Sequence, residues 1–445
     1  MKRILAIILA LVLVLSLAAC ARGDNGTDKK DDENKTDNKT DTDDKKDDNN
    51  DDSSEDVILV GSLWPLTGGS ASIGQSHADG AEMAIKEINA NGGVKSMGGA
   101  KIKLVSADTE TSPDVGSTAC ERLITEDKVC MVIGAYNSTV CISASEVAQK
   151  YSIPFVSMGG VATAVTERGY DHVFRVNNTV TYDVVEMLAG LDDILEELGE
   201  DTLTYSLIYE NSDWGADNAR IWKEAADERG WTCLVDEPVT NGQADMTSQV
   251  LKLKEADADV INVSFYVDDS IVFQNALYAN NVVPRLGVWS VGGGYQDKAF
   301  FSSLDPSIYD GVFVQEDWDV SGKLNHKWIA DLNEDVKAEY GYDMTSFFAQ
   351  GWTAAYIAYY ALEAAGATDD VSIINALKGL EVWNSDDERA LLTGYTAVVF
   401  DEKGQNTYGG GATGGTIVQY QNGEAIGLYP ESHRFPGAVA NIPLK

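Results

Sequence analysis

Side chains that could carry out catalysis or bind a metal are widely separated in this 445-residue chain. The sequence contains no H-E-x-x-H pattern, no Cys/His cluster with zinc spacing and no G-x-S-x-G motif of a serine nucleophile. The four histidines, which stand far apart, are His77, His172, His326 and His433. We therefore expect no catalytic residue and no metal site, and the chain is not expected to be an enzyme.

One glycine-rich segment matches a nucleotide-binding motif. Residues 409–414 (GGGATG) have the spacing G-x-G-x-x-G, which binds a dinucleotide when it follows a strand and opens a helix. Here a strand-like segment, residues 416–420, follows instead. The motif is interpreted as a hairpin loop, and no cofactor is expected.

The chain is strongly acidic, with 71 Asp and Glu residues, 33 Lys and Arg residues and a formal net charge of −38 at pH 7. Most of this excess lies beyond residue 56. Nucleic acids and anionic membrane surfaces carry phosphates that such a body repels, which argues against either as a ligand. The charge is interpreted mainly as a source of solubility.

Residues 1–19 have the layout of a signal peptide, in which Lys2 and Arg3 precede an apolar run and small residues lead to Cys20. The run is shorter than the roughly 20 residues that a membrane-spanning helix needs. Residues 17–20 (LAAC) resemble the bacterial lipoprotein box, in which a peptidase cuts before the cysteine and the thiol receives acyl chains such as palmitate. This resemblance implies that Cys20 is lipidated. An ordinary signal peptide that ends at a chance cysteine is the alternative.

Residues 20–56 are predicted to form a disordered acidic tether. After Cys20 they consist almost entirely of Asp, Lys, Asn, Thr and Ser, so they cannot bury enough apolar surface to offset the loss of chain entropy. Repulsion between like charges favours an extended tether. The protein is expected to stay on the outer face of the cell membrane.

Four further cysteines stand in the body of the chain. An oxidising compartment permits disulfides, but the sequence cannot rank the three possible pairings. Most of these cysteines are interpreted as small buried side chains. They are Cys120, Cys130, Cys141 and Cys233.

Beyond residue 56, short β-branched runs alternate with helical stretches, which is typical of βαβ units. The sequence therefore predicts an α/β fold with two lobes, each a doubly wound parallel sheet. The first lobe is expected to contain residues 57–178 and 317–395, and the second residues 179–316 and 396–445. Because ligands settle at the carboxyl ends of parallel strands, a ligand cleft is expected between the lobes.

Several short motifs follow one another in a distinctive order. They are residues 65–68 (PLTG), 80–93, 132–134 (VIG), 166–170 (TERGY) and 400–404 (FDEKG). Their order resembles the extracellular solute-binding proteins of ABC importers, of the type I periplasmic-binding-protein fold, in the branched-chain amino acid (Leu/Ile/Val) family. The resemblance spans residues 57–445. It implies two lobes joined by three crossovers, which close on a small solute and deliver it to an ABC permease.

The resemblance also implies where the first lobe holds the ligand carboxylate. After residues 132–134 the family places a hydroxyl-bearing loop, and Asn137, Ser138 and Thr139 stand there. A hydroxyl and the N–H groups of a helix start suit a carboxylate. Capping of the following helix is the alternative role for Ser138.

A second loop of the first lobe matches another family position that holds the carboxylate. Gly160, Val161 and Ala162 stand there, and the family's threonine hydroxyl is missing. Backbone N–H groups can still serve, and Thr163 is a candidate replacement for the hydroxyl.

In the second lobe, the resemblance implies that Trp214 and Tyr266 are the aromatic side chains that close over the ligand. Packing at the edge of the lobe is the alternative role for each. The family also places a glutamate for the ligand ammonium after the strand at residues 285–289, but residues 290–294 (SVGGG) contain no acid.

Two explanations of this missing acid stay open. The acid comes from elsewhere, with Glu316, Asp317 and Asp183 as candidates, or the ligand is not an ordinary amino acid. Amides, urea-like solutes and small carboxylates then remain possible.

The predicted function is capture of a small polar solute, an amino acid or a related compound, for an ABC importer. A sensory lipoprotein that binds the same ligands for signalling is one alternative. A hydrolase of an amide-like solute is another, but no paired nucleophile and base are visible in the sequence.

Overall fold

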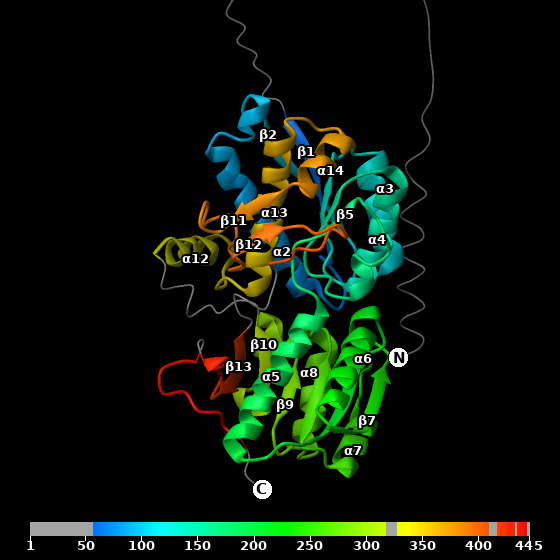
Figure 1. The fold of residues 1–445 in the computed structure, drawn as a ribbon, viewed down its shortest axis with the longest axis vertical. Coiled ribbons are helices and arrows are strands. Elements are labelled where there is room, and N and C mark those ends of the chain that lie inside the picture. The colour runs from blue at the N-terminus through cyan, green and yellow to red at the C-terminus, as the bar shows by residue number, and fades with distance from the viewer. Residues whose placement is uncertain (1–56, 317–326, 409–415, 432–433, 443–445) are drawn as a thin grey trace, which may run out of the picture. The chain divides into compact units, whose positions relative to one another are not determined.

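The computed structural model describes residues 57–316, 327–408, 416–431 and 434–442 (Figure 1). The signal peptide, Cys20, the tether, Asp317 and the glycine-rich segment 409–414 lie outside these ranges. Within them, no helix combines the length and the apolar composition needed to cross a bilayer.

The first lobe is built on a sheet of five parallel strands in the order β2-β1-β3-β4-β5 (Figure 1). The strands are β1 (Val57–Trp64), β2 (Lys101–Asp108), β3 (Val132–Gly134), β4 (Phe155–Ser157) and β5 (Val173–Arg175). The helices of this lobe are α2 (Ala71–Ala90), α3 (Pro113–Thr125), α4 (Ser138–Tyr151), α12 (Lys327–Tyr340), α13 (Ser346–Ala365) and α14 (Asp370–Lys378), with short 3-10 turns η1 (Lys95–Met97) and η2 (Thr163–Val165).

Both faces of the first sheet are covered, as strand β1 shows. Its side chains alternate between the faces. Ile58 and Val60 pack in one apolar cluster with α2 and α13, whereas Leu59 and Leu63 pack in another with α3 and α4. Burial on both sides explains why β1, β3 and β4 are almost continuously apolar.

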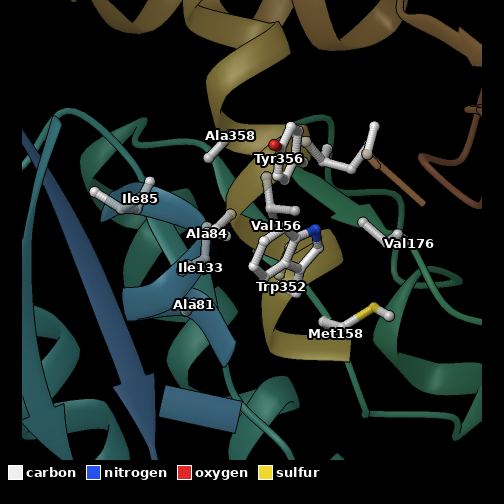
Figure 2. Packing of buried hydrophobic residues seen from close by; sticks show 14 of the residues in the cluster. Ala81, Ala84, Ile85, Ile133, Val156, Met158, Val176, Trp352, Tyr356 and Ala358 are labelled. Carbon is white, nitrogen blue, oxygen red and sulfur yellow. The ribbon is translucent and has the colours of Figure 1, made fainter. Parts of the chain in front are cut away.

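Helices α2 and α13 pack very close together where they cross, because each helix has a glycine that faces the backbone of the other. A Cβ atom at Gly80 would lie 2.1 Å from the carbonyl oxygen of Phe348, and one at Gly351 would lie 1.9 Å from that of His77. Figure 2 shows the packing beside this crossing, where Ala84 of α2 and Trp352 of α13 lie among side chains of the sheet. Through this crossing α13, which is distant from α2 in the sequence, becomes part of the first lobe.

The second lobe is built on a sheet of seven strands in the order β14-β13-β10-β9-β8-β6-β7. Strands β6 to β10 pair in parallel, and β13 and β14 add an antiparallel pair at one edge. The strands are β6 (Thr204–Glu210), β7 (Thr232–Val239), β8 (Val260–Ser264), β9 (Val288–Ser290), β10 (Phe313–Glu316), β13 (Thr416–Gln421) and β14 (Glu424–Tyr429). The helices are α5 (Val180–Leu198), α6 (Asp213–Glu228), α7 (Thr247–Ala256), α8 (Val267–Ala279), α9 (Lys298–Ser303) and α10 (Pro306–Tyr309), with the 3-10 turn η3 (Gly293–Gln296).

The second sheet is also covered on both faces. Tyr205 and Leu207 of β6 belong to a cluster with α5 and α6, and Ile208 belongs to a cluster with α7 and α8. The predicted α/β class with two doubly wound lobes is confirmed, with the antiparallel edge of the second sheet as an addition.

One segment lies in a different lobe from the one expected. Strand β12 (Ala397–Val399) pairs with β11 (Glu381–Trp383), and Val398 and Phe400 belong to the core cluster of the first lobe. Gln405 also bridges to Arg175 at the end of β5. The start of the expected second-lobe segment, residues 396–408, therefore packs with the first lobe, because its short strand finds its partner there.

The four cysteines of the described body are all free thiols. Cys120 and Cys141 are fully buried in the cluster that packs α3 and α4 against the sheet. Cys130 and Cys233 are half-buried at the edges of other clusters. The interpretation as small packed side chains fits the first two best.

Replacing Gly351 with alanine tests the α2–α13 crossing. Gly→Ala in a helix interior normally stabilises by roughly 0.5–1 kcal/mol. Here the new methyl group must push the helices apart, so we expect the free energy of unfolding to fall by about 2 kcal/mol. Denaturant unfolding measures the change.

The matched control is Gly190→Ala in α5, where the nearest side-chain atom, Cγ1 of Ile417, lies at an ordinary contact distance of 3.4 Å. This variant is expected to be neutral or slightly more stable. Equal stability of the two variants would show that the crossing is not as tight as described.

Candidate functional site

A small cavity of about 40 Å³ lies between the two lobes. Its walls follow the carboxyl ends of β3, β4 and β5 in one lobe and of β8 and β9 in the other, where parallel sheets bind ligands. The first lobe contributes Tyr136, Ser138, Gly159, Val161, Asn177, Phe347 and Gln350. The second lobe contributes Asp183, Trp214, Tyr266, Val291, Gly293, Gln296 and Gln315.

Ser138 begins helix α4 at the wall of the cavity, and its side chain is buried. The preceding residue, Asn137, does not cap the helix with its side chain, because its amide donates to Oγ of Ser70 (3.1 Å). The first-turn N–H groups and the positive end of the helix dipole therefore lie beside the cavity. This end of the cavity favours an anionic group. Thr139 is half-buried and is not part of the wall.

The loop after β4 contributes a backbone wall, but only part of it is as expected. Val161 lines the cavity, whereas the N–H of Ala162 donates to Oγ of Ser138 (3.2 Å). Gly160 packs behind the wall, where a Cβ atom would lie 2.6 Å from Sγ of Cys141. Gly160 and Ala162 thus shape the loop, and Val161 is the residue of the three that faces the cavity.

Thr163 does not replace the missing hydroxyl. Its N–H and its hydroxyl both donate to the same carboxylate oxygen of Asp217, at 2.8 Å each. Asp217 belongs to α6 of the second lobe. The side chain of Thr163 therefore links the two lobes.

A buried arginine holds this loop in place. The guanidinium of Arg175 donates to the carbonyl oxygens of Gly160 (3.2 Å) and Ala162 (2.6 Å), to Oγ1 of Thr166 (3.0 Å) and to Oε1 of Gln405. Burial lowers the pKa of Arg175 to about 10, which leaves it charged at neutral pH. None of the sequence motifs indicated this positioning role for Arg175.

Four aromatic rings run across the cavity from one lobe to the other. Trp214 stacks on Tyr266 with ring centroids 5.0 Å apart, Tyr266 lies 5.5 Å from Tyr136, and Tyr136 lies 5.6 Å from Phe347. Burial raises the pKa of both tyrosines well above its usual value, so their hydroxyls keep their protons. The rings form an apolar wall that carries two hydroxyl groups.

The indole of Trp214 explains why position 293, in the loop after β9, carries no side chain. A Cβ atom at Gly293 would lie 2.6 Å from Cη2 of Trp214 and 2.8 Å from the carbonyl oxygen of Phe265. Gly293 also has a positive φ of 64°. A large ring at position 214 thus leaves no room for a side chain at position 293.

Of the three candidate acids, Asp183 lies in the cavity wall. It stands in the first turn of α5 with 4% of its surface exposed, and the side-chain amide of Asn178 donates to it. Glu316 ends strand β10 and is not part of the wall, and Asp317 lies outside the described residues.

His77 supports the wall from behind. Its ring stacks on Trp64 (centroids 4.6 Å apart), and its nitrogens bond to the carbonyl oxygen of Ile73 and to the amide of Gln350, both at 2.9 Å. Burial lowers its pKa from 6.5 to about 4, so the ring is neutral at pH 7. The neutral ring fixes Gln350 at the cavity wall.

Several residues of the cavity wall were not predicted from the sequence. Tyr136 and Asn177 stand two residues after the ends of β3 and β5, so their positions after strands were a usable signal. Phe347 and Gln350 carried no such signal, because α13 reaches the cavity from a distant part of the sequence. The others are Gly159 of the first lobe and Val291, Gly293, Gln296 and Gln315 of the second lobe.

The sequence matches the model of a family described as periplasmic binding protein over residues 57–422. The chain belongs to the periplasmic binding protein family. Membership implies solute binding and an extracytoplasmic location, and the predicted family is confirmed. A curated relative, Leu/Ile/Val-binding protein homolog 8 of Brucella abortus (strain 2308), is 30% identical over 393 residues, which cover 86% of this chain and 92% of the relative.

Solved structures show the same fold as this periplasmic binding protein. The branched-chain amino acid substrate-binding protein LivJ of Streptococcus pneumoniae, in complex with isoleucine, superposes with a TM-score of 0.71 at 19% identity, covering 83% of this chain and 97% of that one. A solute-binding protein of an ABC transporter from R. palustris, in complex with benzoate, has a TM-score of 0.68 at 17% identity, with coverages of 84% and 95%.

The pH dependence of stability tests the buried state of His77. Below pH 6.5 the unfolded chain takes up a proton that the folded protein resists until about pH 4, so stability falls over this window as pH is lowered. At about 1.4 kcal/mol for each tenfold change, the loss amounts to roughly 3 kcal/mol. Denaturant unfolding of the protein and of His77→Gln between pH 7.5 and 4 measures it.

The His77→Gln variant lacks the titrating ring and should show a correspondingly flatter acid limb, even if it is less stable at pH 7. Parallel pH profiles for the two proteins would mean that His77 is not buried in its neutral form.

Proposed function

We propose that this protein captures a small amino acid or related carboxylate between its lobes and delivers it to an ABC importer. The observation that carries the proposal is the cavity itself, where an uncapped helix start at Ser138 faces aromatic rings of the opposite lobe. The helix start suits a carboxylate, and the rings suit an apolar group. A single solute can contact both the helix start and the aromatic rings only when the two lobes surround it.

The ligands of similar proteins agree with this chemistry. The S. pneumoniae protein is in complex with isoleucine and the R. palustris protein with benzoate. The curated relative from B. abortus is named for Leu, Ile and Val. All of these compounds carry a carboxylate beside an apolar group.

Contacts between the lobes support a capture mechanism. Besides the bonds from Thr163 to Asp217, the ammonium of Lys298 donates to Oγ of Ser76 (3.1 Å) and lies 3.2 Å from the ring centroid of Tyr342. The cavity walls are largely buried in this closed arrangement. Solute entry and release would therefore require the lobes to separate, and a bound solute would add contacts that favour closure.

Membrane anchoring is part of the proposal. The lipoprotein-like residues 17–20 support lipidation of Cys20, and acyl chains that bury several CH₂ groups each hold a protein firmly at a membrane. The tether of residues 20–56 would then join the anchor to the binding body. A position beside the permease raises the chance that captured solute is delivered.

The hydrogen-bond partners of the side chains at the cavity wall favour binding without catalysis. Oγ of Ser138 accepts a hydrogen bond from the N–H of Ala162, and the nitrogens of His77 are engaged by Ile73 and Gln350. A nucleophilic serine requires a base within hydrogen-bond reach. These partners support a role for Ser138 in holding a ligand.

Removal of the aromatic wall tests the site. Trp214→Ala combined with Tyr266→Ala should weaken binding of an amino acid or carboxylate ligand at least tenfold, because both rings cover the cavity. A thermal-shift screen first identifies the ligand, since a ligand at 100 times its Kd adds about 2.7 kcal/mol of stability. Isothermal titration calorimetry of the purified chain then measures the affinities.

Tyr278→Ala is the control, since Tyr278 is 54% exposed and lies on α8 of the same lobe. It should bind the ligand as the unaltered protein does. Unchanged affinity of the double variant would place the ligand elsewhere.

A further inference from the structure

We propose that Glu210, which is not part of the cavity wall, is a positioning residue that holds the rings of Trp214 and Tyr266 in that wall. The inference rests on the proposed function, because the two rings belong to the second-lobe surface that a solute would meet. It adds a residue that would act on the solute only through its neighbours.

Glu210 connects three loops at the carboxyl edge of the second sheet. It is the last residue of β6, and its side chain is fully buried. Its carboxyl group accepts hydrogen bonds from the hydroxyl of Ser212, from the side-chain amide of Asn241 (3.2 Å) and from the backbone N–H of Tyr266. These donors belong to the loops that follow β6, β7 and β8. A single side chain therefore fixes the spacing of the three loops.

The bond to Ser212 leads to Trp214. Ser212 is the N-cap of α6, and its Oγ accepts a hydrogen bond from the N–H of Gly215 (3.3 Å). The first turn of α6 also packs directly on Glu210, since a Cβ atom at Gly215 would lie 2.1 Å from the carbonyl oxygen of Glu210 and 3.2 Å from its Cγ. Trp214 stands in this turn, between Ser212 and Gly215, so the place of its indole depends on Glu210.

The bond to Tyr266 fixes the second ring. Tyr266 precedes α8 as its N-cap residue, and its ring stacks on that of Trp214 with the ring centroids 5.0 Å apart. Its backbone N–H is the group that bonds to Glu210. The two stacked rings are thus held by the same carboxyl group, one through the start of α6 and the other through the start of α8.

Burial keeps this carboxyl group neutral. Because burial disfavours its charged form and the nearby carboxylate of Asp269 repels a second negative charge, the pKa of Glu210 rises from 4.5 to about 8. At pH 7 the group therefore carries a proton in most molecules. A neutral acid presents one acceptor oxygen and one O–H donor, and the amide of glutamine presents one oxygen and one N–H₂ group in the same places.

Two replacements of Glu210 separate its hydrogen bonds from its size. Glu210→Leu fills a similar space but leaves the buried donors of Ser212, Asn241 and Tyr266 without their acceptor, so the loops and the rings should shift. Glu210→Gln keeps an acceptor and a donor, so the rings should stay in place.

Gln419→Leu is the matched control. Gln419 is a fully buried amide of the same length on β13 of the same lobe. It donates to the carbonyl oxygens of Gly311 (3.0 Å) and Asn441 (2.9 Å), and none of these residues is part of the cavity wall. Its loss should lower stability without moving the rings.

Fluorine NMR of protein labelled with 5-fluorotryptophan observes the indole of Trp214 without any solute. Trp214→Phe identifies its resonance among those of the nine tryptophans. The resonance should move in Glu210→Leu and stay in place in Glu210→Gln and in Gln419→Leu. An unmoved resonance in Glu210→Leu would overturn the inference.

Calorimetry with the purified full chain measures the consequence for binding. The probes are leucine, isoleucine, valine and benzoate, the solutes named for similar proteins. The probe that binds the unaltered protein most tightly should bind Glu210→Leu at least tenfold more weakly, and Glu210→Gln and Gln419→Leu within threefold of the unaltered protein. Rescue by glutamine is a result that a general loss of stability would not produce.

Unchanged affinity of Glu210→Leu, or an equal loss in Gln419→Leu, would overturn the inference and leave the proposed function standing. If the unaltered protein binds none of these probes and no other common amino acid, the proposed function is contradicted, while the Trp214 resonance still decides the inference. Thermal unfolding of the solute-free variants checks that they fold. If Glu210→Leu does not fold, Ser212→Ala takes its place, and an unmoved Trp214 resonance in that variant would overturn the inference too.

Discussion

A buried arginine stays charged at little cost only when its hydrogen-bond donors find acceptors, and Arg175 finds them behind the wall of the cavity between the lobes. Its guanidinium bonds to the carbonyl groups of Gly160 and Ala162 and to Thr166, and on its other side to Gln405. One side chain thus fixes the loop that presents Val161 and ties the segment after β12 to the end of β5. The shape of the first-lobe wall depends on this network.

The wall contributed by the second lobe follows from a different constraint, which is space. Trp214 lies against Gly293 so closely that a side chain at one position excludes a side chain at the other. The ring stacks on Tyr266, which in turn reaches Tyr136 of the first lobe. A larger aromatic wall therefore goes together with the absence of a side chain at position 293.

Much of the fold could be predicted because strands buried on both faces are short apolar runs, and these runs alternate with helical stretches along the sequence. Ser138, Val161, Trp214 and Tyr266 were predicted from the family resemblance, and all four line the cavity because they follow strands or begin helices at its edge. The same reasoning could not tell Val161, which faces the cavity, from its neighbours Gly160 and Ala162, because backbone direction in a loop is set by tertiary bonds. It also could not foresee that Thr163 would bond to Asp217 of the other lobe.

Contacts between distant parts of the chain account for the other differences. Phe347 and Gln350 reach the wall because Gly80 and Gly351 let α13 pack closely on α2, and no local pattern reports that crossing. The short strand β12 was expected in the second lobe for a similar reason, since its pairing with β11 depends on a partner that local sequence does not identify.

The crystal structure of the protein with its bound solute is the most direct test of the account. The account predicts solute density between the lobes, in contact with Ser138 on one side and with Trp214 and Tyr266 on the other. Density in the separate groove lined by Lys86, Trp328 and Arg389, with the cavity between the lobes empty, would contradict it.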